Sequence, residues 1–201
     1  MRKLLMESKA LCDATDSLVA QNAGLTELVA AFDKFRQIVA APPVSQVESY
    51  RSYVNRRIEE LRESIARALA ARAVERERKL EWFEALEDLN TAVDKYAFKG
   101  EPVASQLALV AKRVADYRAA VKDGRECAAA GRWDAAYRSA VAALDLIPSG
   151  ADGLSLLTSV GPNLTPPEGM VFVPPGTYDL GGADAAPARK ATFPFGFFIS
   201  K

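Results

Sequence analysis

Glycine and proline are distributed unevenly along this chain of 201 residues. Residues 1–147 contain four glycines and three prolines, whereas the much shorter segment 148–201 contains eight of each. Proline removes a backbone donor and glycine costs about 1 kcal/mol in a helix interior, so long helices are credible only in the first segment. The sequence therefore predicts a mainly α protein, with helices over residues 1–158, a linker over 159–168 and a short β-rich segment over 169–201.

The first part of the helical segment carries an apolar residue at every seventh position. The repeat consists of Leu4, Leu11, Leu18, Leu25, Phe32 and Val39, with Ala14, Leu28 and Phe35 three positions after its members. This pattern is typical of a helix that packs along a partner helix, as in a coiled coil. Gln21 and Gly24 weaken its middle, and Pro42-Pro43 ends it, because a residue before proline avoids the α conformation.

A second apolar stripe follows the proline pair. It begins with Val47, Tyr50, Val54, Ile58, Leu61, Ile65 and Ala68, and it resumes from Trp82 to Tyr96. A continuous helix over 44–98 would be roughly 80 Å long, and the short connection makes its first half an antiparallel neighbour of the first helix. The remaining stripe must be covered either by later helices or by a second copy of the chain.

Charge and composition exclude several classes of function. The 26 basic and 26 acidic residues balance, so neither a nucleic acid nor a membrane is expected as partner. The charged residues between Arg51 and Glu81 fit a solvated helix face with pairs such as Glu63–Arg67. The absence of histidine excludes Ser-His and Cys-His nucleophiles and the commonest metal ligand from this chain. No catalytic, cofactor-binding or metal-binding residue is therefore predicted.

Cysteine usage and hydropathy favour a cytoplasmic protein. Cys12 and Cys127 lie far apart and form no metal-binding pattern, so we expect two reduced, buried thiols. The N-terminal segment lacks the apolar run of a signal peptide, and no stretch approaches the ~20 apolar residues of a membrane helix.

Residues 117–148 resemble a single tetratricopeptide repeat. The matching positions are Gly124, Gly131, Trp133, Ala136, Ala143, Leu144 and Pro148. In this pattern glycine permits the turn, tryptophan wedges the helix pair and alanine permits close approach. An ordinary helical hairpin that buries alanines explains the same residues. Either structure presents a protein-facing surface, and the interaction positions that we predict are Leu61, Ile65, Trp133, Tyr137 and Leu144.

The β-rich segment is predicted to contain three short strands. These are Met170–Val173, Thr177–Leu180 after a turn at Pro174-Pro175-Gly176, and an aromatic strand over Thr192–Ser200 after a loop at Gly181-Gly182. The segment resembles the opening of a formylglycine-generating enzyme (sulfatase-modifying factor) domain. The matching residues are Gly169, Met170, Val171, Val173, Pro174, Gly176, Thr177, Gly181, Phe195, Phe197, Ile199 and Lys201.

This resemblance implies the start of a C-type-lectin-like α+β domain that is incomplete in this chain. In the family, the catalytic and metal-binding residues, with copper or calcium, lie beyond the matched segment, so none is carried over. We expect a non-catalytic interaction or oligomerisation module on a truncated domain, a fragment or cleavage product of a bacterial sensor or effector. Its partner is then a protein, either the missing C-terminal portion or a second copy. The alternative is the regulatory N-terminal part of an oxidoreductase of this family.

Overall fold

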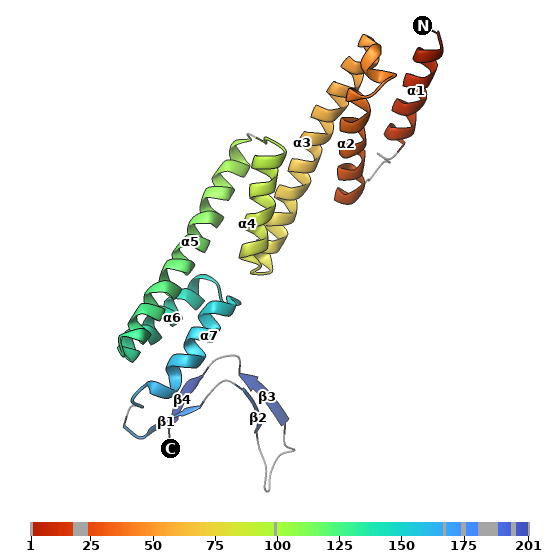
Figure 1. The fold of residues 1–201 in the computed structure, drawn as a ribbon. Helices are drawn as coiled ribbons and strands as arrows, with labels where there is room; N and C mark the ends of the chain where they lie inside the picture. Colours follow the sequence, from red (N-terminus) through yellow and green to blue (C-terminus); the bar gives the residue numbers. More distant parts are fainter. Residues whose placement is uncertain are drawn as a thin grey trace. The chain divides into compact units, whose positions relative to one another are not determined.

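The computed structural model describes residues 2–17, 24–98, 100–166, 168–173, 176–180, 189–193 and 196–200. These residues form seven α-helices followed by four short strands, which confirms the prediction of a mainly α fold with a short β segment (Figure 1). The chain divides into two compact units, Met1–Leu109 (unit 1) and Val110–Lys201 (unit 2). Each unit is described by itself below.

Unit 1 is a bundle of helices. Its elements are α1 (Arg2–Asp16), α2 (Leu25–Ala40), a 3-10 turn η1 (Val44–Gln46), α3 (Glu48–Arg78), α4 (Trp82–Asn90), a π-helical turn η2 (Thr91–Lys95) and the start of α5 (Glu101–Ala129). Helix α1 contacts α2, η1 and α3, and α2 packs along α3 (Figure 1). The single first helix that the heptad repeat suggested is wrong, because α1 ends at Asp16 and α2 begins after Gly24, whose backbone is extended.

The continuous helix expected over residues 44–98 is also wrong, because the chain reverses between α3 and α4. Leu80 adopts the left-handed conformation with φ of 64°. Its N–H donates to the Glu77 carbonyl (3.0 Å), and the N–H of Glu81 donates to the Arg76 carbonyl (2.9 Å). This pair of bonds is the Schellman arrangement, which usually requires glycine at the left-handed position. Helix α4 consequently folds back along α3 (Figure 1).

A buried ionic cluster joins the two helices of this turn. The Asp88 carboxylate on α4 is 4% exposed and accepts hydrogen bonds from Nε (2.8 Å) and Nη2 (2.6 Å) of Arg72 on α3. Arg76 Nη1 lies 2.9 Å from the same carboxylate and donates to the Glu84 carbonyl at 2.8 Å. The hydrogen bond to Asp88 raises the pKa of Arg72. Two guanidinium groups thus compensate one buried carboxylate, the condition under which such burial is tolerated.

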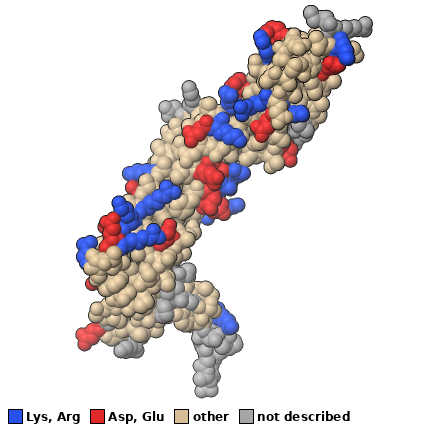
Figure 2. Space-filling model, in the orientation of Figure 1, with Lys and Arg blue, Asp and Glu red and all other residues tan. Residues whose placement is uncertain are grey.

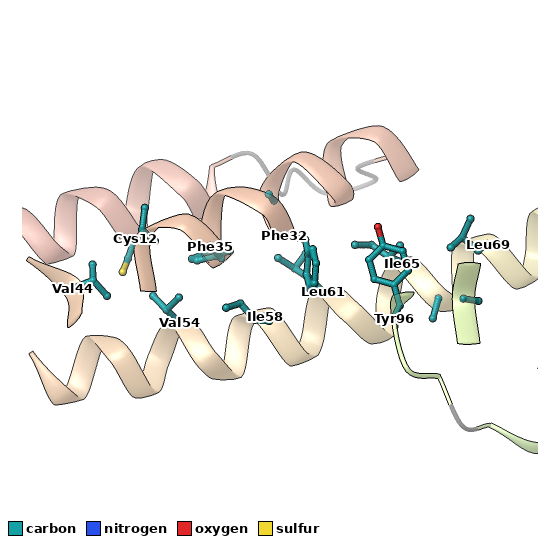
Figure 3. Packing of buried hydrophobic residues seen from close by; sticks show 14 residues of the cluster. Cys12, Phe32, Phe35, Val44, Val54, Ile58, Leu61, Ile65, Leu69 and Tyr96 are labelled. Carbon is teal, nitrogen blue, oxygen red and sulfur yellow. The ribbon is translucent and has the colours of Figure 1, made fainter. Parts of the chain in front are cut away.

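The core of unit 1 lies between α2 and α3. Phe32 and Phe35 on α2 face Ile58, Leu61 and Ile65 on α3 (Figure 3). Tyr96, which follows η2, extends this core, and its ring meets that of Phe32 edge to face with centroids 5.4 Å apart. The second apolar stripe of the sequence is therefore covered within this chain.

Unit 2 contains the rest of α5, α6 (Trp133–Leu146), α7 (Ala151–Val160) and a 3-10 turn η3 (Gly161–Asn163). Gly131, with φ of 69°, forms the turn between α5 and α6 with the same Schellman bonds that surround Leu80. A Cβ at Gly124 would collide with the Leu156 side chain and lie 3.2 Å from Ser139 Cβ, so glycine allows α5 to approach α6 and α7 closely. The expected linker over residues 159–168 begins inside α7 and includes η3.

The β segment forms two antiparallel two-stranded sheets, which together we call the hairpin. Strand β1 (Met170–Val173) pairs with β4 (Phe197–Ser200), and β2 (Gly176–Leu180) pairs with β3 (Arg189–Phe193), both antiparallel. The two expected strands at 170–173 and 177–180 thus follow one another along one arm, and the expected strand 192–200 is divided between β3 and β4. The register differs by one residue between the ladders, with Val173 opposite Phe197 in one and Gly176 opposite Phe193 in the other. The predicted loop at Gly181-Gly182 lies outside the described residues.

Phe172 connects this hairpin to the helices of unit 2. A Cβ added at Gly161, at the end of α7, or at Gly196, before β4, would collide with the Phe172 ring. Phe172 also meets Phe198, its partner across the ladder, edge to face with centroids 5.4 Å apart. Phe198 in turn packs against the buried cluster of α6 and α7. Two glycines therefore create the space in which one aromatic ring attaches the sheet.

Candidate interaction groove

An apolar groove lies in unit 2 between α6, α7 and the start of β4. Its volume is about 500 Å³. The groove is lined by Tyr137, Val141, Leu144, Asp145 and Pro148 from α6 and its C-terminal end, by Leu157 from α7, and by Gly196 and Phe197 from the hairpin. Successive turns of α6 place its lining residues on one face, because positions three and four apart lie side by side on a helix. We call this hollow the α6–α7 groove.

The polar groups of the α6–α7 groove are few and favour a positive charge. Asp145 is the charged residue among those that line it, and its side chain is exposed. It lies in the last turn of α6, where the carbonyl ends of the helix add negative potential. Tyr137 adds one hydroxyl group. The site therefore combines apolar walls with a negative end.

Phe197 connects the α6–α7 groove with a row of aromatic side chains on the hairpin. Its ring centroid lies 4.8 Å from that of Phe193, which lies 6.1 Å from Tyr178. Aromatic rings at such separations attract each other and provide rigid apolar area. The hairpin thus contributes Phe197 to the groove, and the rings of Phe193 and Tyr178 follow it outside the groove lining.

The predicted interaction residues are distributed over both units. Tyr137 and Leu144 line the α6–α7 groove, as their helical spacing allows. Trp133 packs against the buried cluster of α6 and α7 at the opposite end of α6. Leu61 and Ile65, only 2% and 0% exposed, are core residues of unit 1 and offer no surface to a partner, so their selection is corrected.

Six lining residues are not among the interaction positions predicted from the sequence: Val141, Asp145, Pro148, Leu157, Gly196 and Phe197. Val141 follows Tyr137 by four residues, so helical spacing could have found it. Leu157 and Phe197 come from other elements, and only the packing of unit 2 brings them to the groove. Phe197 was singled out for the domain resemblance alone.

The charged residues of α3 form a solvated face with ion pairs along the helix. Glu63 and Arg67 pair at 2.5 Å, as predicted, and Arg62 and Glu59 pair at 2.9 Å. Figure 2 shows basic and acidic side chains interleaved over much of the face in view. Exposed pairs of this kind contribute about 0–1 kcal/mol each. They do not form a basic docking surface.

Cys12 and Cys127 are both buried and free, in agreement with the prediction. Burial raises the pKa of the Cys12 thiol, and the nearby carboxylates Asp16 and Asp13 raise it further. The residues that the structure describes contain no group of His, Cys, Asp and Glu that could hold a metal ion. Among the described helices, none combines the length and the apolar character needed to cross a membrane.

The fold and the groove describe a mainly α-helical chain with an attached β-hairpin and an apolar hollow beside it. Comparisons with protein-family models, with curated proteins and with solved structures found no match.

Proposed function

We propose that the chain is a non-catalytic protein-interaction module and that the α6–α7 groove is its binding site. The observation that carries this proposal is the combination of apolar side chains from three elements with a single lining carboxylate, Asp145. Protein-binding sites typically have such an apolar centre with few charges. The occupant that fits is a protein segment with a large apolar side chain beside a lysine or arginine.

Peptide selection tests this proposal. The chain is immobilised and a random peptide library is displayed against it, after which the enriched peptides are synthesised and their affinity is measured by fluorescence anisotropy. Enriched sequences should carry Leu, Phe or Trp next to Lys or Arg. Replacing Val141 by Glu places a charge in the apolar wall and should weaken binding at least about tenfold.

Ala142→Glu is the matched control, because Ala142 is exposed, adjacent on α6 and absent from the groove lining. Thermal unfolding of both variants shows whether each is folded. Reversal of the Asp145 charge in Asp145→Lys should remove the preference for basic peptides. Enriched peptides that bind wild type and Val141→Glu equally, both folded, would show that the groove is not the binding site.

We further propose that the hairpin is the start of a formylglycine-generating-enzyme-like domain. Val171 and Ile199, paired across the β1–β4 ladder, are 42% and 44% exposed, which supports this view because small sheets need a further partner face. The coding sequence downstream of Lys201 tests it. A continuation into the rest of such a domain is expected, and a stop codon would contradict it. A cysteine pair or iron-binding histidines in the continuation would favour the oxidoreductase instead.

A further inference from the structure

The fully buried residues of α1 are small or polar, and the half-buried Leu11 packs beside them against the core of unit 1. These buried residues are Ser8, Cys12 and Thr15, with exposed fractions of 0%, 2% and 2%. They follow one another at intervals of four and three, so they form one stripe along the helix. In contrast, the larger Leu5 and Met6 are 38% and 67% exposed. Helix α1 therefore buries Cys12 and part of Leu11 but leaves the large apolar residues Leu5 and Met6 exposed.

The buried hydroxyl groups of this stripe do not bind α2 or α3. Ser8 Oγ is buried and has no hydrogen-bond partner. Thr15 Oγ1 donates to the carbonyl of Leu11 within the same helix at 2.8 Å. A buried hydroxyl without a partner loses its bonds to water and gains nothing in return, so the docked position of α1 is disfavoured at Ser8.

A polar contact at its C-terminal end also attaches α1 to α3. Asp16 accepts hydrogen bonds from Tyr53 and from Arg57, both on α3, with 2.8 Å between Arg57 Nε and Asp16 Oδ1. Arg57 and Asp16 are half-buried, and Arg57 also pairs with Glu60. A charge-assisted contact therefore holds α1 at its C-terminal end, whereas the buried stripe along the helix is small and polar. We call the contact of Asp16 with Tyr53 and Arg57 the latch.

The surface beneath this latch is apolar. Cys12 lies among Phe35, Val44 and Val54, which are fully buried when α1 is in place (Figure 3). These three residues belong to α2, η1 and α3, whose mutual contacts do not involve α1. Displacement of α1 would uncover them while leaving the α2–α3 core of Phe32, Leu61 and Ile65 intact.

We infer that α1 opens separately from the rest of unit 1, and that opening exposes the Cys12 thiol and the apolar surface formed by Phe35, Val44 and Val54. Local opening below the global unfolding energy is expected where few apolar contacts hold an element. The inference concerns unit 1 alone and does not depend on the function proposed for the α6–α7 groove.

Two measurements on the full chain under native conditions test this inference. In hydrogen exchange, amides in the middle of α1 should exchange at least about tenfold faster than those in the middle of α3. The rate at which a maleimide alkylates Cys12 should depend only weakly on the urea concentration, because the opening of α1 exposes much less surface than global unfolding does. Cys127 is the internal control, because it is buried in unit 2 and movement of α1 does not uncover it.

Substitutions in α1 and in its contact with α3 identify which groups weaken the docking of α1 and which groups stabilise it. Ser8→Ala removes the hydroxyl without a partner and should slow the alkylation of Cys12 at least about fivefold. Ser17→Ala is the matched control, because Ser17 is exposed and its Oγ bonds only to the Ala14 carbonyl. Arg57→Gln, on α3, removes the cationic partner of Asp16 while keeping the carboxylates that raise the pKa of Cys12, and it should accelerate alkylation about tenfold. The reaction of Cys127 should be unchanged in all three variants.

Other results would overturn the inference. If Cys12 reacted only as fast as the global unfolding of unit 1, with the same urea dependence, α1 would not open separately. If Ser8→Ala and Ser17→Ala left the rate equally unchanged, the unsatisfied hydroxyl would not weaken the docking of α1. Equal protection of α1 and α3 in hydrogen exchange would contradict the inference without any substitution.

Discussion

The hydroxyl oxygen of Tyr117 on α5 accepts a 2.8 Å hydrogen bond from the backbone N–H of Gly153 in the first turn of α7. The N-cap of α7 is Gly150, which has no side chain to accept such a bond. The first N–H groups of a helix need acceptors, and here a residue 36 positions away provides one. Tyr117 thus performs the role of a capping residue from a neighbouring helix.

Tyr117→Phe should lower the free energy of unfolding by about 1 kcal/mol, because a buried N–H loses its acceptor while the ring remains. Urea unfolding followed by circular dichroism measures the difference. Tyr137→Phe is the control, since Tyr137 lines the groove and is only half-buried. Equal losses in the two variants would mean that the Gly153 contact contributes nothing specific.

The turns at Leu80 and Gly131 share one backbone conformation but not one residue type. An L-residue in the left-handed region loses about 1–2 kcal/mol relative to the right-handed one, and glycine does not. Leu80→Gly should therefore raise the free energy of unfolding by about 1 kcal/mol, and Gly131→Ala should lower it by about as much. A Cβ at Gly131 meets no atom within 4 Å, so its effect reports the backbone alone.

Thermal and urea unfolding of both variants measure these changes. Leu80 is 43% exposed, so the loss of its side chain removes little packing. A destabilised Leu80→Gly variant would show that this side chain contributes more to the turn than its conformation costs.

The raised pKa of Tyr53 should make the free energy of unfolding fall at alkaline pH. Burial, with the hydrogen bond to Asp16 and its charge, raises the pKa of Tyr53 from 10.0 to about 12. Because the unfolded state releases this proton first, the stabilisation is present below pH 10 and is lost as the pH rises from 10 to about 12. Unfolding free energies of wild type and Tyr53→Phe should therefore converge over this interval.

Absorbance at the tyrosinate wavelength measures the ionisation of Tyr53 independently of its effect on stability. One tyrosine should ionise later than expected for an exposed phenol, and this late step should be absent in Tyr53→Phe. A difference between wild type and variant that does not change with pH would contradict the assignment.

We expect the Phe172 side chain to contribute most of the free energy that attaches β1 and β4 to the helices of unit 2. Phe172→Ala leaves the space between Gly161 and Gly196 empty and should cost about 2–3 kcal/mol in the docking of β1 and β4. Hydrogen exchange of the amides in these strands measures it directly. Ile199→Ala, on an exposed position of the same ladder, is the control and should cost clearly less. Similar losses of protection in the two variants would contradict the role of Phe172.

The predictable features of the fold are those that short-range chemistry encodes. Pro42-Pro43 ends α2 and Gly131 ends α5, and both residue types restrict or permit backbone conformations in a known way. The reversal at Leu80 carries no such signal, because leucine is a good helix former. Its stability depends on Asp88, Arg72 and Arg76, which meet only after the chain has reversed.

The candidate site was predictable to the same degree. Tyr137 and Leu144 share a face of α6 and could be found from spacing, whereas Leu157 and Phe197 join them through tertiary packing. Leu61 and Ile65 show what helical spacing alone does not reveal. Their periodicity identifies an apolar stripe but does not say whether another helix of the same chain covers it, and here α2 does.

The absence of glycine at Leu80 has a consequence for how unit 1 reaches its structure. Local preference over residues 48–98 favours a single straight helix of roughly 75 Å, because nothing at Leu80 opposes it until Asp88 meets its arginines. The native hairpin therefore competes with an extended rod that satisfies the same backbone bonds. Folding of this unit is then a selection between two helical forms, in which the Asp88 ion pairs and the burial of Ala85 and Leu89 favour the hairpin without a glycine at the bend.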